Sequence, residues 1–390
     1  MRPLLGTLLV VLIGLAAAVA IGFYPGFSST SDVADDEQEG FDQALVIKFS
    51  HVVAENTPKG LAAQRFARLV SEKTNRRVKV EVFPNAVLYN ETDEMDALMR
   101  GSVQMIAPSF ANLSEHVPAW LTFDLPYAFL SDEAVQEAFD GELGKLLFDK
   151  LASKDLVGLS YWGNGFKQMT SNRGPLIHPS DFKEQRFRIL PSKVIEAQFR
   201  QFEAKTTPIP FNEVYRGLES GVVDGEENTI SNIRTKKFYQ VQKYMTISNH
   251  GYLGYTVLMN KSFWDKLPGD VKQPLAEALE ETAHWANDNA IEMNRRQLEE
   301  LRHQGGLQIH VQTPEERREW MQRLEPIYQE FEATIGKDVM SRIRELREKY
   351  GVSEAMTVAC WNSTTFLQDN PYFFAGYPKT NKKENKRYNI

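Results

Sequence analysis

Arg188 is the residue whose type and position most suggest chemistry, because it lies inside the apolar run Phe187 to Leu190. Burying a guanidinium costs several kcal/mol unless an anion pairs with it. That anion could be a bound ligand, whereas the alternative is an arginine on the solvent face of a half-buried strand. Arg173, between Asn172 and Gly174, is a loop or hinge arginine, and a plain surface position is the stronger alternative for it.

Asn228 closes the segment Val222 to Asn228, in which a strand is expected to reach a turn. The carboxyl ends of strands are where α/β folds commonly bind ligands. An amide at such a position can donate to a carboxylate and accept from a hydroxyl. Asn228 is therefore a second candidate for ligand binding.

Signatures of catalysis and of cofactor binding are missing from the sequence. Gly163-Asn164-Gly165 has Gln168 where a dinucleotide loop needs its third glycine, and Gly158 to Trp162 ends in Trp where a nucleophile elbow needs Gly. The histidines never show a metal-ligand spacing such as His-Glu-x-x-His. We therefore expect no enzymatic activity, no metal and no cofactor.

Composition limits the class of protein. A chain of 390 residues can form two lobes with separate cores. The net charge of -7 gives no long-range attraction for nucleic acid, which we exclude as a partner. Cys360 is the single cysteine, so intramolecular disulfides and cysteine-based metal sites are excluded as well.

The first residues have the pattern of an export signal. Arg2 precedes an apolar stretch from Leu4 to Ala20, with a small-residue cleavage site at Ala18-Val19-Ala20. We expect residues 1–23 to be a signal peptide or an uncleaved anchor, residues 24–43 to be a solvated linker, and the folded body to be periplasmic.

The body alternates strand and helix patterns. An apolar run at Val46 to Phe49 and an alternating run at Val78 to Val82 predict strands, and helical spacing predicts helices over Ala62 to Val70 and Met95 to Met99. This order predicts an α/β fold with a largely parallel sheet. The stretch Leu98 to Gln104 is similar to Leu218 to Asp224, because each is expected to end a helix on a glycine and to start a strand within two residues. Two similarly built lobes would explain this similarity, and an ordinary helix-to-strand connection that happens to occur twice would explain it equally well.

One helix is expected to be unusually long. Apolar spacing continues from Asp270, expected as the N-cap, to about His303, before Gly305-Gly306. At 1.5 Å per residue this helix would be about 50 Å long and could pack along both lobes. The alternative is two helices with a break near Asn287 to Asn289.

A last helical segment is predicted beyond a short strand at Leu307 to Val311. It begins with the capping-box letters of Thr313 to Glu316 and continues through Phe331. The composition changes beyond about Tyr350. Cys360 to Ile390 lack periodicity, and we expect this atypical tail (351–390) to be poorly ordered or foreign to the fold.

Six segments together resemble the substrate-binding subunits of TRAP transporters (the DctP family), most closely those that bind four-carbon dicarboxylates. The resemblance covers roughly Val46 to Tyr350. The segments that carry it are Phe49-Ser50-His51-Val52-Val53, Phe123-Asp124-Leu125-Pro126-Tyr127, Tyr161-Trp162-Gly163-Asn164-Gly165-Phe166, Phe211-Asn212-Glu213-Val214-Tyr215, Val223-Asp224-Gly225-Glu226-Glu227-Asn228 and Asn249-His250-Gly251-Tyr252-Leu253-Gly254-Tyr255.

The resemblance implies roles for particular residues. The family's carboxylate-binding arginine falls on Arg188, its asparagine after the Asp-Gly turn on Asn228, and its aromatic before the Glu-Val-Tyr motif on Phe211. Arg173 matches a second ligand arginine of some members. The cleft-lining positions of the family fall on His51, Lys59, Ser109 and Trp162.

The resemblance also implies a two-lobe fold like that of periplasmic binding proteins, with a hinge and a long helix crossing both lobes. We expect residues 44–170 and 254–290 to form lobe I, and residues 171–253 and 291–350 to form lobe II. Closure around a small organic acid anion such as succinate, malate or fumarate, followed by delivery to one small and one large membrane subunit, would be the function. The rival interpretations are an exported enzyme acting on a small acid and a receptor that feeds a sensor protein.

Overall fold

The computed structural model describes the backbone of residues 44–361 and the side chains of residues 44–351. The predicted export segment, the predicted linker and the part of the tail beyond residue 361 lie outside the described residues. Within the described part, none of the helices combines the length and the apolar character needed to cross a bilayer.

The described strands form one mixed ten-stranded sheet in the order β2-β1-β3-β9-β4-β7-β5-β6, with β8 paired to β4 and to β10. Neighbours β1, β2 and β3 are parallel, as are β5, β6 and β7, whereas β4 and β9 run antiparallel to their neighbours. The strands are β1 (Leu45–Ser50), β2 (Val78–Phe83), β3 (Met105–Ile106), β4 (Leu156–Ser171), β5 (Arg186–Ile189), β6 (Lys205–Pro208), β7 (Gly225–Thr229), β8 (Tyr244–Ile247), β9 (Tyr252–Asn260) and β10 (Gln308–Val311).

The long strand β4 joins the two halves of this sheet. Its residues Leu156 to Phe166 pair with β9 of the first half, and Lys167 to Ser171 pair with β7 of the second half. The change of partner falls between two adjacent residues, so one strand passes directly from one lobe into the other. The predicted two-lobe α/β architecture is thereby confirmed.

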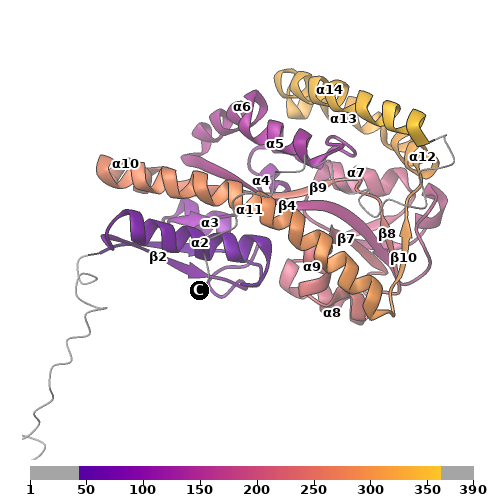
Figure 1. Cartoon of the computed structure of the whole chain (residues 1–390), viewed down its shortest axis with the longest axis horizontal. Helices are drawn as coiled ribbons and strands as arrows, with labels where there is room; N and C mark the ends of the chain where they lie inside the picture. Colours follow the sequence, from indigo (N-terminus) through magenta and orange to yellow (C-terminus); the bar gives the residue numbers. More distant parts are fainter. Residues whose placement is uncertain (1–43, 362–390) are drawn as a thin grey trace, which may run out of the picture.

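The described helices flank the sheet (Figure 1). They are α2 (Pro58–Lys73), α3 (Glu94–Met99), α4 (Phe110–Ser114), α5 (Asp132–Asp140), α6 (Glu142–Leu151), α7 (Lys193–Gln201), α8 (Val214–Glu219), α9 (Ile230–Thr235), α10 (Lys261–Lys266), α11 (Gly269–Gln304), α12 (Pro314–Leu324), α13 (Pro326–Ile335) and α14 (Lys337–Trp361).

Helix α11 is continuous over 36 residues and crosses both lobes, contacting α2 in the first half, β4 in the middle and α9 in the second (Figure 1). The predicted long helix is confirmed, and the alternative of a break near Asn287 to Asn289 is wrong. The expected N-cap is also wrong, because Pro268 occupies that position. Asp270 instead lies in the first turn, where its charge suits the helix dipole and pairs with Arg77 at 2.6 Å.

The polar residues that suggested a break attach α11 to β4. The Asn287 side chain accepts a hydrogen bond from the backbone N–H of Gly163 at 2.7 Å, and Asn294 donates one to the carbonyl of Asn164 at 2.7 Å. Gly165 has a φ of +126°, and a Cβ there would lie 2.7 Å from the Asn294 side chain. The glycines of this segment therefore allow the helix to approach an irregular part of β4, where its register with β9 shifts.

The two similar helix-to-strand segments also have similar backbones. Gly101 and Gly221, which follow α3 and α8, have φ values of +74° and +69°. Such left-handed conformations favour glycine after a helix. The strands that follow start at Met105 and Gly225, later than the expected two residues.

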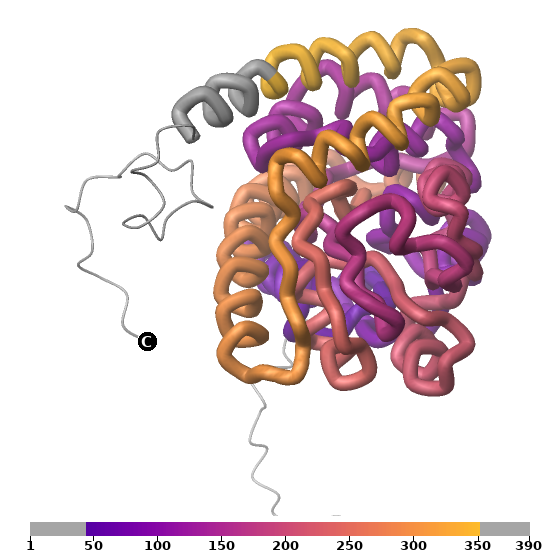
Figure 2. Tube along the Cα trace, turned by 90° about the vertical axis from the view of Figure 1, so that its right-hand side faces the viewer, coloured from indigo at the N-terminus to yellow at the C-terminus, as the bar shows by residue number. Residues whose placement is uncertain are grey.

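The C-terminal helices return from the second half to the first. The predicted capping box is present, because Thr313 accepts from the N–H of Glu316 while Glu316 accepts from that of Thr313. The segment does not run unbroken to Phe331, since α12 ends at Leu324 and Pro326 starts α13. Helix α14 then packs on α5 and α6 (Figure 2) and continues past Tyr350 to Trp361.

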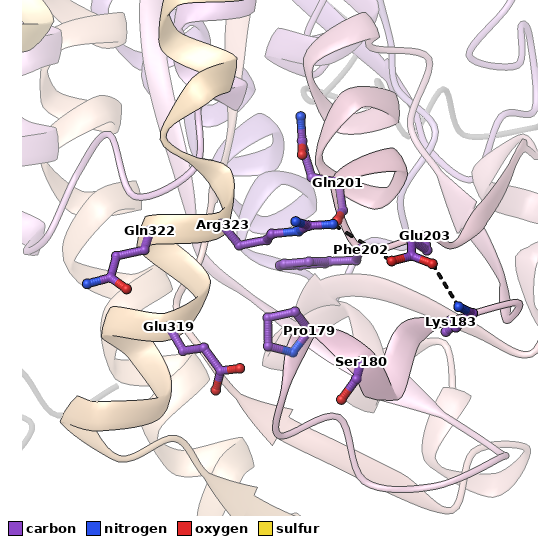
Figure 3. A pocket seen from close by; sticks show the side chains of 9 residues that line it. All are labelled: Pro179, Ser180, Lys183, Gln201, Phe202, Glu203, Glu319, Gln322 and Arg323. Atoms are coloured by element: carbon purple, nitrogen blue, oxygen red, sulfur yellow. Dashed lines mark hydrogen bonds and ion pairs between the residues drawn. The ribbon is translucent and has the colours of Figure 1, made fainter.

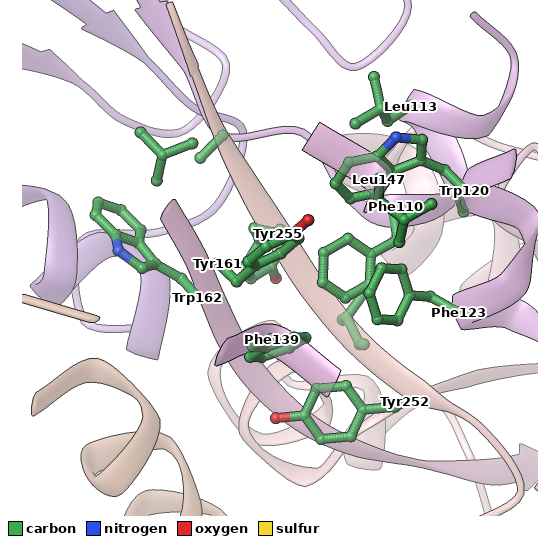
Figure 4. Close-up of a cluster of buried hydrophobic side chains, with 14 of the residues drawn as sticks. Phe110, Leu113, Trp120, Phe123, Phe139, Leu147, Tyr161, Trp162, Tyr252 and Tyr255 are labelled. Carbon is green, nitrogen blue, oxygen red and sulfur yellow. The ribbon is translucent and has the colours of Figure 1, made fainter. Parts of the chain in front are cut away.

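An aromatic cluster dominates the core of the first half (Figure 4). Tyr161 of β4 stacks on Phe148 at a centroid distance of 4.2 Å and on Phe139 at 5.1 Å, and its hydroxyl donates to the carbonyl of Gly144. The next residue, Trp162, packs on Phe49 instead. Successive side chains of a strand point to opposite faces of the sheet, so β4 contributes to the core on both sides.

A smaller apolar cluster belongs to the second half, around Phe211, Val214 and Phe238. Val52 and Val53, which follow β1 of the first half, are buried in the same cluster at 4% and 2% exposure. Apolar side chains from the two halves therefore meet, and the structure shows the lobes closed against each other.

Candidate functional site

A buried cavity lies between the two halves, at the carboxyl ends of their parallel strands. The space between its walls, counted together with the solvent open to it, is about 340 Å³. Both charged and apolar side chains line it: Val52, Val53, Lys59, Glu91, Glu94, Ser109, Arg188, Leu190, Phe211, Asn228, Asn232, Leu253 and Tyr255. Five of the sequence-predicted site residues, Lys59, Ser109, Arg188, Phe211 and Asn228, are brought together here.

Arg188 is the cation that β5 contributes. Its side chain is 1% exposed, although Arg186 on the same strand is exposed. Nε donates to the carbonyl of Ile209 at 2.8 Å, which fixes the orientation of the guanidinium. Nη2 is buried and has no hydrogen-bond partner among the described residues. A buried guanidinium with a free N–H is suited to binding a carboxylate.

Glu91 is the anion nearest to Arg188. One of its carboxylate oxygens accepts a hydrogen bond from the backbone N–H of Phe211 at 2.9 Å and lies 3.6 Å from Nη2 of Arg188. Glu91 follows β2 and Phe211 follows β6, the two edge strands of the main sheet path. This contact therefore connects, across the cavity, the two segments that follow these edge strands, one from each lobe.

Lys59 is the second cation of the cavity and lies in the first turn of α2. Nζ donates to the carbonyl of Ala107 at 2.8 Å and lies 3.8 Å from the ring centroid of Tyr255. Burial lowers the pKa of Lys59 to about 8, although the neighbouring carboxyl groups of Glu94 and Glu91 oppose this effect. Lys59 thus supplies a positive charge in the first lobe, opposite Arg188 in the second.

Glu94, the first residue of α3, is a carboxyl group inside the same cavity. Its side chain is 1% exposed and neither oxygen has a hydrogen-bond partner among the described residues. Burial raises the pKa of Glu94 to about 8; Lys59 opposes the rise and Glu91 adds to it. In the closed arrangement the neutral acid is therefore favoured over the carboxylate at pH 7.

Asn228 lies at the carboxyl end of β7 and is 3% exposed. Its nitrogen donates to Glu226 at 3.0 Å and its oxygen accepts from Asn232 at 2.7 Å. Burial raises the pKa of Glu226 to about 7, opposed by Asn228 and Arg188. The amide carries a second N–H that it can offer to a ligand.

Phe211 and Ser109 complete the predicted wall. Phe211 is 4% exposed and packs edge-on against Phe238. Ser109 is the N-cap of α4, where its hydroxyl donates to the side chain of Asn112 at 2.9 Å and accepts from the N–H of Asn112. Contacts within each lobe therefore fix both side chains before any ligand binds.

Three residues that the resemblance placed in the cleft lie elsewhere. Arg173 is exposed and directs its guanidinium to the carbonyl of Glu184, because it follows the end of β4 on the outside of the second half. Trp162 packs on Phe49 beneath the cavity wall. His51 is fully buried near Lys59, and burial together with that charge lowers its pKa to about 3, so it remains neutral.

Several lining residues were missed at the sequence level. Glu91 and Glu94 lie in the polar stretch Asn90 to Asp96, where nothing distinguishes them from solvent-exposed acids. Val52, Val53, Leu253 and Tyr255 belong to the segments that carry the family resemblance, so those segments could have indicated them. Nothing in the sequence marks Leu190 or Asn232 as part of the wall.

A larger groove, of about 1060 Å³, opens on the surface between α12 and the end of α7 (Figure 3). Its two cations are already paired with one carboxylate, since Lys183 lies 3.0 Å and Arg323 lies 3.8 Å from Glu203. Lys183 and Arg323 are 60% and 48% exposed, so the groove lacks a buried cation such as Arg188, which is 1% exposed in the cavity.

A second group of buried charges lies where β4 changes lobe. Nζ of Lys167 is 2.6 Å from one oxygen of Glu227, and the other oxygen is 2.8 Å from Nε2 of His250, whose Nδ1 contacts Ser248. Burial opposes ionisation of Glu227, but Lys167 and His250 together lower its pKa to about 2. The members of this group bind one another, and none of them lines the cavity.

Chemically, the cavity can hold an anion. No group of three or more His, Cys, Asp or Glu side chains in the described part of the chain is arranged to hold a metal ion. The two cations on opposite walls, the amide of Asn228 and the apolar side chains suit a small molecule with two negative ends.

Comparisons with known proteins agree with this geometry. Residues 49–334 match the model of the family described as bacterial extracellular solute-binding protein, family 7 (DctP). The C4-dicarboxylate-binding protein DctB of Bacillus subtilis is 47% identical over 89% of this chain and 99% of its own length. The periplasmic C4-dicarboxylate-binding protein DctP of Rhodobacter capsulatus is 45% identical over 77% of this chain and 91% of its own.

Solved structures give the same result. A TRAP periplasmic solute-binding protein from Sulfurospirillum deleyianum with bound succinate superposes with a TM-score of 0.74 at 43% identity, covering 77% of this chain and 99% of its own. One from Pseudomonas aeruginosa with bound L-malate has a TM-score of 0.71 at 35% identity, covering 73% and 99%. The chain belongs to family 7 of the bacterial extracellular solute-binding proteins, the DctP family.

Proposed function

We propose that this protein is the solute receptor of a TRAP transporter and binds a C4-dicarboxylate such as succinate, malate or fumarate in the cavity at Arg188. The observation that carries the proposal is Nη2 of Arg188, which is buried between the two lobes, has no hydrogen bond among the described residues and lies 3.6 Å from Glu91. Relatives that share 35% to 47% identity are named for C4-dicarboxylates or contain succinate or malate. Their ligands indicate the size and charge of the molecule that this cavity would take.

In this proposal, Arg188 binds one carboxylate of the ligand and Lys59 faces the other. Asn228 offers a hydrogen bond, Ser109 lines the wall beside the ligand, and Phe211 covers the apolar middle of the ligand. A hydrogen bond to a charged group contributes about 1.5–3 kcal/mol. Arg173, Trp162 and His51 have no direct role, because they lie outside the lining.

Closure of the lobes follows from the same contacts. Lys59 and Arg188 belong to different halves of the sheet, so a ligand that binds both makes more contacts in the closed state than in the open one. A ligand shifts such an equilibrium by its difference in affinity for the two states. The closed, loaded form would be the one that the membrane subunits recognise.

A thermal-shift screen of the purified protein across organic acids tests the proposal. A ligand that binds only the folded state raises the melting temperature by an amount that grows with the logarithm of its concentration relative to Kd. Succinate, malate and fumarate should raise it, whereas the monocarboxylate butyrate, which lacks the second charge, should have a much smaller effect. Turnover of an acid during incubation, or no shift with any dicarboxylate, would contradict it.

The membrane partners and the location are part of the proposal. An exported receptor would work outside the cytoplasm and deliver its ligand to one small and one large membrane subunit. Transport of radiolabelled succinate into vesicles containing those two subunits should require this protein. Transport that proceeds equally well without it would contradict this role.

A further inference from the structure

The balance of charge in the cavity is unusual for an anion site. Two cations, Lys59 and Arg188, face two carboxyl groups, Glu91 and Glu94, so the fully ionised cavity would already be neutral. A dicarboxylate brings two further negative charges into this buried space. Because an unbalanced buried charge is costly, one of the carboxyl groups is expected to take up a proton.

Glu94 is the group best placed to do so. Glu91 accepts a hydrogen bond from the backbone of Phe211 and lies 3.6 Å from Nη2 of Arg188, so its charge already has partners. Glu94 has no such contact, since both its oxygens are buried without a hydrogen-bond partner in the described part of the chain. A neutral carboxyl group can also donate an O–H hydrogen bond to a ligand carboxylate, which the carboxylate form cannot do.

The surroundings of Glu94 compensate its charge only in part. Lys59 is the nearest cation, but its ammonium group already donates to Ala107 and lies over the ring of Tyr255. Burial raises the pKa of Glu94 to about 8. Five titratable or charged groups face this region: Lys59 of α2, the neutral His51 after β1, Glu91 of the loop between β2 and α3, Tyr255 of β9 and Arg188 of β5.

We propose that Glu94 takes up one proton when the lobes close on a dicarboxylate and holds the ligand as the neutral acid, so that the ligand and a proton bind together. The proton adds to a carboxylate oxygen of Glu94 and comes from solvent, and no other bond changes. This inference rests on the proposed function, because it requires a dianionic ligand in this cavity. It also requires that Glu94 is in contact with water and ionised at pH 7 in the open state, so that closure removes it from water.

Calorimetry of succinate binding in several buffers tests the proposal. The observed enthalpy changes with the ionisation enthalpy of the buffer, and the slope gives the number of protons taken up. At pH 7, where succinate is a dianion, the slope should be close to one proton for the wild-type protein. Glu94→Gln should bind succinate with a slope near zero. Asp96→Asn, an exposed neighbour on α3, should keep the wild-type slope.

The outcomes separate this inference from the function itself. Tight succinate binding by the wild type with a slope near zero would overturn the proton uptake and leave the proposed function intact. A slope near one that persists in Glu94→Gln would overturn the assignment to Glu94. No binding of any dicarboxylate to the wild type would overturn the proposed function and the inference together.

A second measurement covers the case in which Glu94→Gln does not fold. Infrared difference spectra of the wild-type protein, with and without carbon-13-labelled succinate, separate the protein's carboxyl bands from those of the ligand. A new carbonyl band of a protonated protein carboxyl should appear on binding at pH 7. Its absence would contradict the proposal.

Discussion

The carboxylate of Glu91 accepts a hydrogen bond from the backbone N–H of Phe211 at 2.9 Å, although these residues follow opposite edge strands of the sheet. The same carboxylate lies 3.6 Å from Nη2 of Arg188. Glu91 therefore acts on the closed state in two ways. It connects the lobes, and it places a negative charge beside the proposed anion site.

Glu91→Gln separates these two effects. The amide oxygen can still accept from Phe211, but the negative charge is removed. Succinate should bind more tightly, by roughly three- to tenfold, because about 1 kcal/mol of repulsion between ligand and side chain is removed. Calorimetric titration measures this change, and weaker binding by the variant would show that the charge of Glu91 supports the ligand.

The Lys167 and Glu227 pair should matter for stability rather than for ligand contacts. Lys167→Met leaves the Glu227 carboxylate buried without its cation, which should cost about 3–5 kcal/mol in the free energy of unfolding. The double variant with Glu227→Gln should recover much of that loss. Urea denaturation measures both, and a single variant within about 1 kcal/mol of wild type would contradict the account.

The same group predicts how stability responds to acid. The pKa of Glu227 falls from 4.5 to about 2 in the folded protein, so its contribution is complete above pH 4.5 and is lost as the pH falls towards 2. Burial lowers the pKa of His250 below 6.5, although Glu227 opposes this, so protonation of the unfolded chain also reduces stability below pH 6.5. Because the raised pKa values of buried acids such as Glu94 and Glu226 act in the opposite direction, the wild type is compared with the Lys167→Met, Glu227→Gln double variant. The melting temperature of the wild type relative to this variant should fall from pH 7 to pH 3, and a relative increase would be inconsistent with the shift of Glu227.

Gly165 is required by the contact between β4 and α11. Gly165→Ala should destabilise the protein by about 1–3 kcal/mol, because a side chain is strained at a φ of +126° and its Cβ would lie 2.7 Å from Asn294. Gly174→Ala, at a loop glycine with no atom within 4 Å of the added Cβ, is the matched control. Thermal unfolding compares the two, and equal melting temperatures would contradict this role for Gly165.

The sequence indicated the fold largely through its periodicity and its turns. Spacing of apolar residues predicted α11, and the letters at Thr313 and Glu316 predicted the capping box of α12. The polar Asn287 was misinterpreted as a break because the sequence does not show that a strand bulge lies opposite it. Pro326 ended a helix that hydrophobic spacing alone would have continued.

The site was only partly accessible to the same reasoning. Arg188 was recognisable because a cation in an apolar run is costly by itself, and Asn228 because it ends a strand. Glu91 and Glu94 were not, since their burial depends on loops from opposite edges of the sheet meeting in three dimensions. Trp162 was assigned to the cleft from the family resemblance alone, and the face that its side chain takes depends on the irregular register of β4.

The most direct test of the central claim is calorimetric titration of Arg188→Ala and Arg188→Lys with succinate, beside Arg186→Ala as the control on the exposed face of β5. The account predicts that Arg188→Ala binds succinate about 10- to 100-fold more weakly than the wild type does. Arg188→Lys should also bind succinate more weakly, because a point charge cannot replace the planar guanidinium with its several N–H donors. Arg186→Ala should bind as wild type does. Undiminished affinity in a folded Arg188→Ala protein would contradict the claim that this guanidinium holds the ligand.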